Sequence, residues 1–117
     1  GEHVWQVANG EGIRDHEALR GLDLRPLGVA SRPVALVTRT LLFLGEGSNV
    51  FGGIQPNMWG SGFRAYDKAS GRVVWQTELP AGTTGGPMTY MHAGRQYIVV
   101  PIGATDHAAE WVALALP

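Results

Sequence analysis

An internal repeat constrains this chain more than any other feature of its sequence. Gly1–Val7 reads GEHVWQV and Gly71–Thr77 reads GRVVWQT, so glycine, valine, tryptophan and glutamine recur at the same spacing. A second correspondence links the apolar runs within 32–45 to those within 86–103. Units of about 40–50 residues with four short β-type runs and a recurring tryptophan are typical of β-propeller blades.

The β-type runs divide the chain into three parts. We expect an outer strand of a preceding blade within 1–7, a complete blade over 33–78, and three strands of a last blade over 86–117. Individual strands are predicted at 3–7, 33–38, 40–45, 62–67, 72–78, 86–91, 95–102 and 111–116. Because repeat arrays need several units to bury their faces, the sequence predicts an all-β fragment of a larger propeller, with one full blade plus parts of two others.

The turn between two predicted strands carries a recognisable motif. Ala65–Trp75 reads AYDKASGRVVW, in which Asp67 can accept backbone N–H groups, Gly71 suits a positive φ, and the tryptophan supplies a flat apolar wedge. This A-x-D-x-x-T-G-x-x-x-W pattern, with Ser70 in place of threonine, resembles the tryptophan-docking repeat of the pyrroloquinoline-quinone (PQQ) dependent dehydrogenases. Trp5 and Trp75 are therefore expected to hold blades together and to carry no chemistry.

The resemblance extends over essentially all 117 residues. Leu79–Tyr90, Gly94–Val100 and Val112–Pro117 are similar to the last blade of the membrane-bound glucose dehydrogenase branch. It implies an eight-bladed propeller, of which this chain is the C-terminal fifth or less. It also implies oxidation of a sugar, polyol or alcohol, most readily of the glucose type, with transfer of electrons to a quinone acceptor on the periplasmic side of the inner membrane.

The resemblance further implies PQQ and calcium as cofactors. In that family an aspartate accepts the hydroxyl proton and calcium polarises the quinone, and both the aspartate and the calcium ligands are expected outside this fragment. We therefore assign no catalytic residue and no metal ligand, and we expect the isolated chain to be inactive because one wall of a pocket cannot position the reacting atoms.

Antiparallel order sorts the predicted loops onto two ends of the blades. The long connections, 8–32, 46–61, 79–85 and 103–110, share one end, and the short turns share the other. Since binding residues concentrate on loops held by a rigid scaffold, the end with the long connections is the expected functional face.

Loop 103–110 holds the candidate cofactor contacts Gly103, Asp106 and His107. His107 can donate to a quinone oxygen and Asp106 can orient it. Glucose-oxidising members of the resembled family show Gly-Gly-His-Gly here, whereas this chain reads Gly-Ala-Thr-Asp-His. A solvated loop histidine is the alternative interpretation.

Loop 46–61 holds the candidate substrate-face residues Asn57 and Trp59 among several glycines. An amide and an indole on such a loop can supply a hydrogen bond and an apolar wall to a substrate. The alternative is structural, with Pro56-Asn57 forming a turn and Trp59 covering the rim of the blade.

Segment 8–32 contains the triplet Asp15-His16-Glu17, which could suggest a metal site. Adjacent residues rarely converge on one ion, so a short helix around 15–20 that begins at an aspartate is expected instead.

Composition narrows the remaining function classes. Charged residues make up 16% of the chain and the formal net charge is −1, which disfavours a nucleic-acid-binding surface. The chain has no cysteine, and therefore neither a disulfide nor a thiolate metal site.

Two readings compete with the enzyme fragment. One is a non-catalytic propeller that serves as an interaction scaffold of the cell envelope. The other is a free-standing module that pairs its open strand edges with a second copy, which predicts a homo-oligomer in solution.

Overall fold

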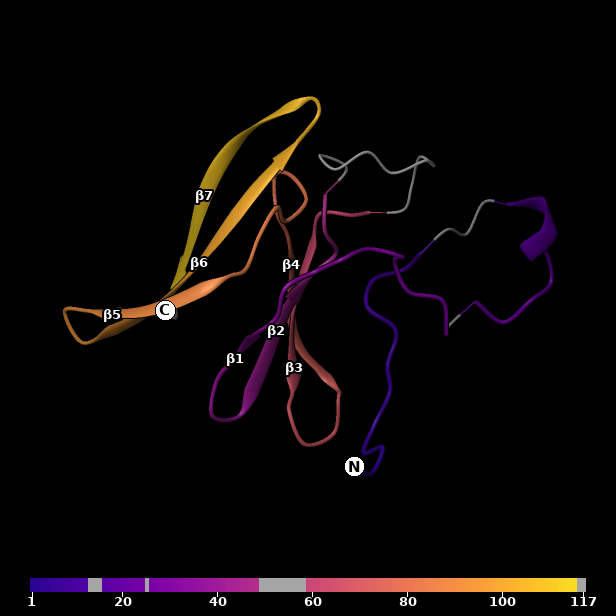
Figure 1. Ribbon diagram of the computed structural model, residues 1–117, viewed down its shortest axis with the longest axis horizontal. Coiled ribbons are helices and arrows are strands. Elements are labelled where there is room, and N and C mark those ends of the chain that lie inside the picture. The colour runs from indigo at the N-terminus through magenta and orange to yellow at the C-terminus, as the bar shows by residue number, and fades with distance from the viewer. Residues whose placement is uncertain (13–15, 25, 49–58, 116–117) are drawn as a thin grey trace.

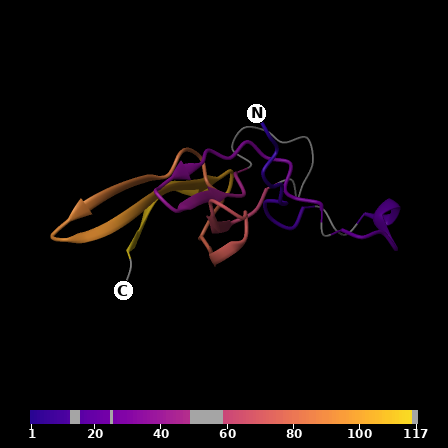
Figure 2. The ribbon, with the colours of Figure 1, turned by 90° about the horizontal axis from the view of Figure 1, so that it is seen from below.

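The computed structural model contains two antiparallel sheets and one short 3-10 helix, which confirms the all-β prediction. The structure describes residues 1–117 except 13–15, 25, 49–58 and 116–117. Figure 1 shows the two sheets side by side, with the N-terminal part of the chain extending away from them. Seen from below in Figure 2, the chain is elongated, with the β5–β6 hairpin at one end and the 3-10 helix at the other.

The first sheet has the order β1-β2-β3-β4, in which sequence neighbours pair. Its strands are β1 Leu36–Val37, β2 Leu41–Gly45, β3 Gly62–Asp67 and β4 Val73–Glu78. The first strand is shorter than the predicted 33–38 because only Leu36 and Val37 pair with β2. The register between β3 and β4 shifts between Ala65 and Tyr66, which pair with Trp75 and Val73, so Val74 of β4 has no partner in this ladder.

The second sheet has the order β5-β6-β7. Its strands are β5 Met88–His92, β6 Arg95–Ala104 and β7 His107–Ala115. The prediction of a loop over 103–110 is therefore wrong. Strand β6 ends at Ala104 and β7 begins at His107, so a two-residue turn, Thr105 and Asp106, joins them, and Ala104 pairs with His107. His-Ala-Ala-Glu has little intrinsic strand preference, and its strand conformation comes from the ladder with β6.

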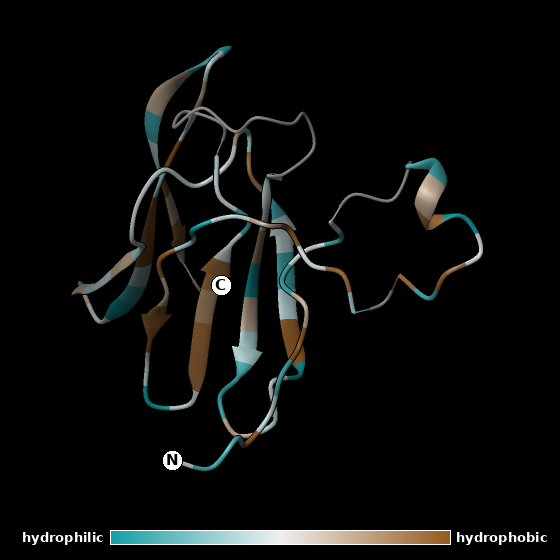
Figure 3. Cartoon of the chain, turned by 45° about the vertical axis from the view of Figure 1, so that its right-hand side comes forward, coloured by the Kyte–Doolittle hydropathy of each residue, from teal (hydrophilic) through white to brown (hydrophobic). Residues whose placement is uncertain are grey.

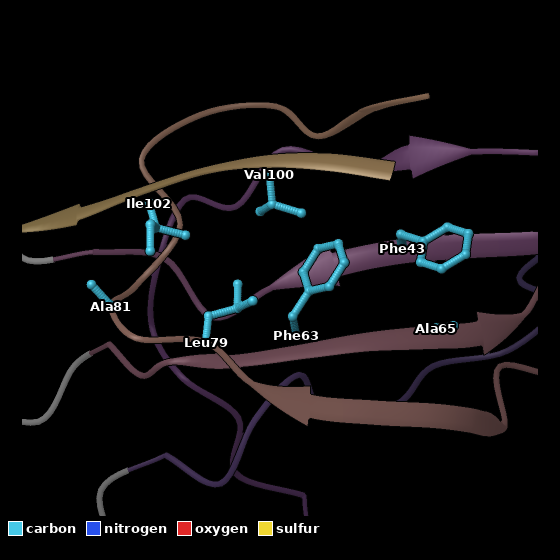
Figure 4. Packing of buried hydrophobic residues seen from close by; sticks show 7 residues of the cluster. All are labelled: Phe43, Phe63, Ala65, Leu79, Ala81, Val100 and Ile102. Atoms are coloured by element: carbon cyan, nitrogen blue, oxygen red, sulfur yellow. The ribbon is translucent and has the colours of Figure 1, made fainter. Parts of the chain in front are cut away.

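The core lies between the two sheets. Phe43 and Phe63 of the first sheet stack with centroids 6.2 Å apart, and Val100 and Ile102 of β6 are fully buried. Figure 4 shows these side chains facing one another, with Leu79 and Ala81 of the connecting segment completing the cluster. Figure 3 shows hydrophobic residues concentrated on some of the strands, whereas other strands alternate hydrophilic and hydrophobic residues. Burial of one large apolar side chain contributes about 1.5–3 kcal/mol, so this cluster holds the sheets together.

Trp5 docks on the turn that joins β3 and β4. Its Nε1 donates to the carbonyl oxygen of Lys68 at 3.0 Å, and its ring covers Gly71, whose φ is 71°. The Asp67 carboxylate accepts the amide and the hydroxyl of Ser70 at 2.8 and 2.7 Å. These hydrogen bonds lower the pKa of Asp67. The motif residues form the turn as expected, and the predicted role of Trp5 in joining two blades stays a prediction.

The N-terminal segment differs from its predicted structure in two respects. Residues 3–7 form no strand within the described chain; a strand partner would belong to a preceding blade, so that prediction stays untested. The helix expected around 15–20 is the 3-10 helix Glu17–Leu19, whose N-cap is His16, and Asp15 lies outside the described residues. No residue of this helix is buried, so tertiary packing does not extend it.

Candidate functional site

A cavity of about 320 Å³ opens where the connecting segments of both sheets meet. The connection between β2 and β3 contributes Ser48, Trp59 and Ser61, and the β6–β7 turn contributes Asp106 and His107. The backbone of 80–82, which links the sheets, forms the remaining side. Three of the residues predicted from sequence, Trp59, Asp106 and His107, therefore line one site. We call it the inter-sheet cavity.

Two polar side chains, Asp106 and His107, lie at the β6–β7 turn. Asp106 is exposed at the tip, and His107 begins β7 with a side chain that is 31% exposed. The Nε2 atom of His107 lies 3.3 Å from Oε2 of Glu110. A residue on a paired strand has less freedom than one on a long loop, so the histidine is held at the cavity wall by the ladder and by this carboxylate.

Gly103 is buried and does not line the inter-sheet cavity in the described part of the chain. Its amide donates to the carbonyl oxygen of Gly82 at 3.0 Å, and its own carbonyl accepts the hydroxyl of Ser48. Thr83 forms an isolated bridge with Ile102. The backbone of Gly103 thus connects the segment at Gly82 and the start of the β2–β3 connection at Ser48 to the second sheet.

Asn57 lies outside the described residues. Trp59 is half-buried and lines both the inter-sheet cavity and a second cavity of about 340 Å³. Trp59 therefore lies next to both cavities, and its roles as a substrate contact and as a cover of the blade rim stay predictions.

Sequence reasoning missed the ion pair in the second cavity. Glu46 is 7% exposed and pairs with Arg64, and both side chains line that cavity together with Glu11 and Glu78. The Glu46 carboxylate occupies the space that Cβ atoms would fill on residues 60 and 62, both glycines. The sequence does contain a signal for this buried carboxylate. Glu46 directly follows the apolar run 41–45, and glycines at 60 and 62 leave room for its side chain.

A second set of hydrogen bonds lies beside this ion pair in the sequence of the first sheet. The Tyr66 hydroxyl donates to Oδ1 of Asn9 at 2.9 Å, and the Asn9 amide donates to the carbonyl oxygen of Gly45 at 2.8 Å. Burial raises the pKa of Tyr66, and the Arg64 charge lowers it in part. The network attaches the N-terminal segment to the first sheet beside Glu46.

The described residues contain no group of three or more histidine, cysteine, aspartate or glutamate side chains that could hold a metal ion. Nor does that part of the chain include a helix long and apolar enough to cross a membrane.

Comparison with known proteins places the fold and the motif in one family. Residues 1–98 match the family described as "Glucose/ethanol/alcohol dehydrogenase, beta-propeller domain", the propeller of PQQ-dependent enzymes. The chain belongs to this family. Its two sheets are consequently part of such a propeller, and Trp5 docks on the β3–β4 turn that carries the repeat motif.

Individual relatives of this quinoprotein family match part of the chain. A quinoprotein glucose dehydrogenase of Gluconobacter oxydans is 42% identical over 59 residues, or 46% of this chain and 7% of the relative. A probable quinate dehydrogenase (quinone) of Xanthomonas campestris pv. juglandis is 38% identical over 60 residues, covering 46% of this chain and 8% of the relative. Methanol dehydrogenase [cytochrome c] subunit 1 of Paracoccus denitrificans is 45% identical over 40 residues, 34% of this chain and 6% of the relative.

The chain thus spans less than a tenth of the length of these relatives. The family is PQQ-dependent, and PQQ carries several carboxylates that need cationic or N–H partners. Among the described lining residues, His107 is the one that can become cationic, and its Nε2 faces Glu110, while Asp106 adds a negative charge. The described part of this cavity has no lysine or arginine in its lining, and the roles of Asp106 and His107 as cofactor contacts stay predictions.

Proposed function

We propose that this chain forms part of the substrate-facing wall of a PQQ-dependent dehydrogenase that oxidises a sugar, polyol or alcohol, with glucose as the leading substrate. The match of residues 1–98 to the family's propeller domain carries this proposal. The convergence of Trp59, Asp106 and His107 on one cavity supports it, because these residues come from segments expected at the functional face.

The proposal extends to the place and partners of the whole enzyme. Glucose and quinate dehydrogenases among the relatives bear names that specify quinone chemistry, which supports a quinone as the electron acceptor. We propose a periplasmic location at the inner membrane for the same enzyme. Gly103, Asp106 and His107 stay predictions as cofactor contacts, and Asn57 stays a prediction as a substrate contact.

Reduction of an artificial electron acceptor tests this function. The full-length protein that carries this chain is loaded with PQQ and calcium and supplied with glucose, glycerol, methanol or quinate in separate assays. We expect turnover with glucose and glycerol, and none from the 117-residue chain alone under the same conditions. Absence of turnover with every substrate, in protein shown to be folded, would overturn the proposal.

Binding of PQQ distinguishes the dehydrogenase from the alternative, a non-catalytic propeller scaffold. PQQ should quench tryptophan fluorescence of the full-length protein if it is a quinoprotein, whereas a non-catalytic propeller should show no saturable quenching. Membrane and soluble fractions of the source cell, probed with an antibody against this chain, test the location.

One face of the second sheet supports association with another surface. Met88, Tyr90 and Trp111 point to the side that faces away from the first sheet and are 50%, 42% and 67% exposed. We infer that another blade of the same protein covers this face. In the isolated chain the same apolar surface favours a homodimer, which sedimentation at micromolar concentration would detect.

A further inference from the structure

We infer that Asn9 is a site of spontaneous deamidation that the fold holds closed, and that its modification releases the N-terminal segment from the first sheet. Asn9 is followed by Gly10, and this dipeptide is the least hindered one for the reaction because glycine has no side chain to shield its amide nitrogen. The inference concerns a chemical modification of the chain and does not rest on the proposed dehydrogenase activity.

The packing of this segment requires a glycine after Asn9. Gly10 has a φ of 77°, in the left-handed region that favours glycine. A Cβ atom at this position would lie 2.6 Å from Cγ2 of Val29 and 2.7 Å from Oε1 of Glu46, which is closer than packed atoms can approach. The reactive dipeptide is therefore a consequence of how the N-terminal segment packs on the first sheet.

Hydrogen bonds hold both ends of the Asn9 side-chain amide. Its Nδ2 donates to the carbonyl oxygen of Gly45 at 2.8 Å, and its Oδ1 accepts the hydroxyl of Tyr66, a residue that is 1% exposed, at 2.9 Å. The main-chain carbonyl of Asn9 accepts the amide of Val29 at 2.7 Å. The side chain therefore cannot turn without breaking two hydrogen bonds to the first sheet.

Deamidation needs that turn. The Gly10 amide nitrogen gives its proton to water or hydroxide and attacks Cγ of Asn9; the bond from Cγ to Nδ2 breaks, and ammonia leaves with a proton from water. Water then opens the cyclic imide to aspartate or isoaspartate, so the net change is gain of water and loss of ammonia. Ring closure moves Cγ and frees Nδ2, so the reaction rate follows the population in which the Gly45 and Tyr66 hydrogen bonds are open.

The product cannot restore the attachment. An aspartate at position 9 has no N–H group for the Gly45 carbonyl, and its charge arrives beside the buried carboxylate of Glu46. Isoaspartate adds a methylene group to the main chain, which displaces the carbonyl that accepts the Val29 amide. Either product therefore weakens the contact between the N-terminal segment and the first sheet.

Mass spectrometry of the Asn9 peptide tests the inference. The full-length protein that carries this chain is incubated at mildly alkaline pH, folded and in urea, and the aspartate and isoaspartate forms of the peptide are quantified over time. Tyr66→Phe removes the hydroxyl that holds Oδ1. Tyr90→Phe makes the same change on β5 of the second sheet and is the matched control.

We expect deamidation to be slower in the folded protein than in urea. Tyr66→Phe should speed it about fivefold in the folded protein, the effect of one hydrogen bond of ordinary strength, and should leave the rate in urea unchanged. Tyr90→Phe should match the original protein. Equal rates in folded and unfolded protein, or an unchanged rate in Tyr66→Phe, would overturn the inference. A slower rate in Tyr66→Phe would also overturn it, because the hydroxyl would then assist the attack.

Hydrogen exchange tests the release of the segment. Asn9→Asp reproduces one product and should speed exchange of the Val29 amide about tenfold, while the Gly103 amide, bonded within the second sheet's connection, should keep its rate. Gln96→Glu adds the same charge at an exposed residue of β6 and should change neither amide. An unchanged Val29 rate in Asn9→Asp would overturn the release. Faster exchange at both amides in Tyr66→Phe would show global unfolding and overturn local control of Asn9.

Discussion

Replacing Gly71 by alanine tests how Trp5 attaches the N-terminal segment to the first sheet. Gly71 has a φ of 71°, and a Cβ atom there would lie 2.6 Å from Cε3 and 2.7 Å from Cδ2 of the Trp5 ring. The ring cannot stay where it is, because a carbon atom needs about 3.5–4.0 Å. Its hydrogen bond to the Lys68 carbonyl would be lost as the ring moves.

The expected cost has two separable parts. An alanine in the left-handed region costs about 1–2 kcal/mol. Loss of the indole hydrogen bond and of part of its apolar contact adds about 1–2 kcal/mol. Gly94→Ala is the matched control: its φ is 76°, and nothing lies within 4 Å of its Cβ position. Gly71→Ala should therefore destabilise the chain by about 1–2 kcal/mol more than Gly94→Ala.

A double-mutant cycle isolates the contact. Urea unfolding is followed by far-ultraviolet circular dichroism for the original chain, Gly71→Ala, Trp5→Ala and the double variant. Once Trp5 is gone, the alanine at 71 meets no ring, so the double variant should lose about 1–2 kcal/mol less than the sum of the single losses. Equal losses in Gly71→Ala and Gly94→Ala, or strict additivity in the cycle, would refute the docking contact.

Three further substitutions probe the core, the buried ion pair and the turn. Phe63→Ala should cost about 3–5 kcal/mol in urea unfolding because the ring is fully buried, and a loss below about 1 kcal/mol would contradict its central place. Glu46→Gln leaves a buried guanidinium without its partner and should cost about 3–5 kcal/mol, part of which the double change with Arg64→Met should restore; no recovery would argue against the pair. Hydrogen bonds from Ser70 lower the pKa of Asp67, so the ionised carboxylate stabilises the fold above the unfolded-state pKa, and this stabilisation is lost as the pH falls through the folded-state pKa. Between about pH 5 and pH 2 the melting temperature should therefore drop more in the original chain than in Asp67→Asn. Equal drops would contradict this role of Asp67.

The turn motif was predictable because its chemistry is local. Asp67 and Ser70 are three residues apart, and their hydrogen bonds form wherever the chain turns as the glycine allows. The strand predictions at 40–45, 62–67 and 72–78 succeeded for a similar reason, since apolar and β-branched residues there already favour extended chain.

The β6–β7 connection shows where local reasoning stops. Residues 107–110 read HAAE, which predicts no strand, yet they pair with the end of β6. A ladder partner that lies close in space supplies hydrogen bonds that local preference does not reveal. The sequence analysis therefore placed His107 on a long loop, whereas it is the first residue of β7.

The sequence by itself determined the β-type runs, the repeat, the tryptophan-bearing turn and the family to which they belong, because each depends on residues only a few positions apart. Tertiary structure alone decided that Trp59 and Asp106 line one cavity, that Glu46 is buried against Arg64, and how far β6 and β7 extend. These features depend on distances between residues far apart in the chain, which only the packing of one sheet on the other sets.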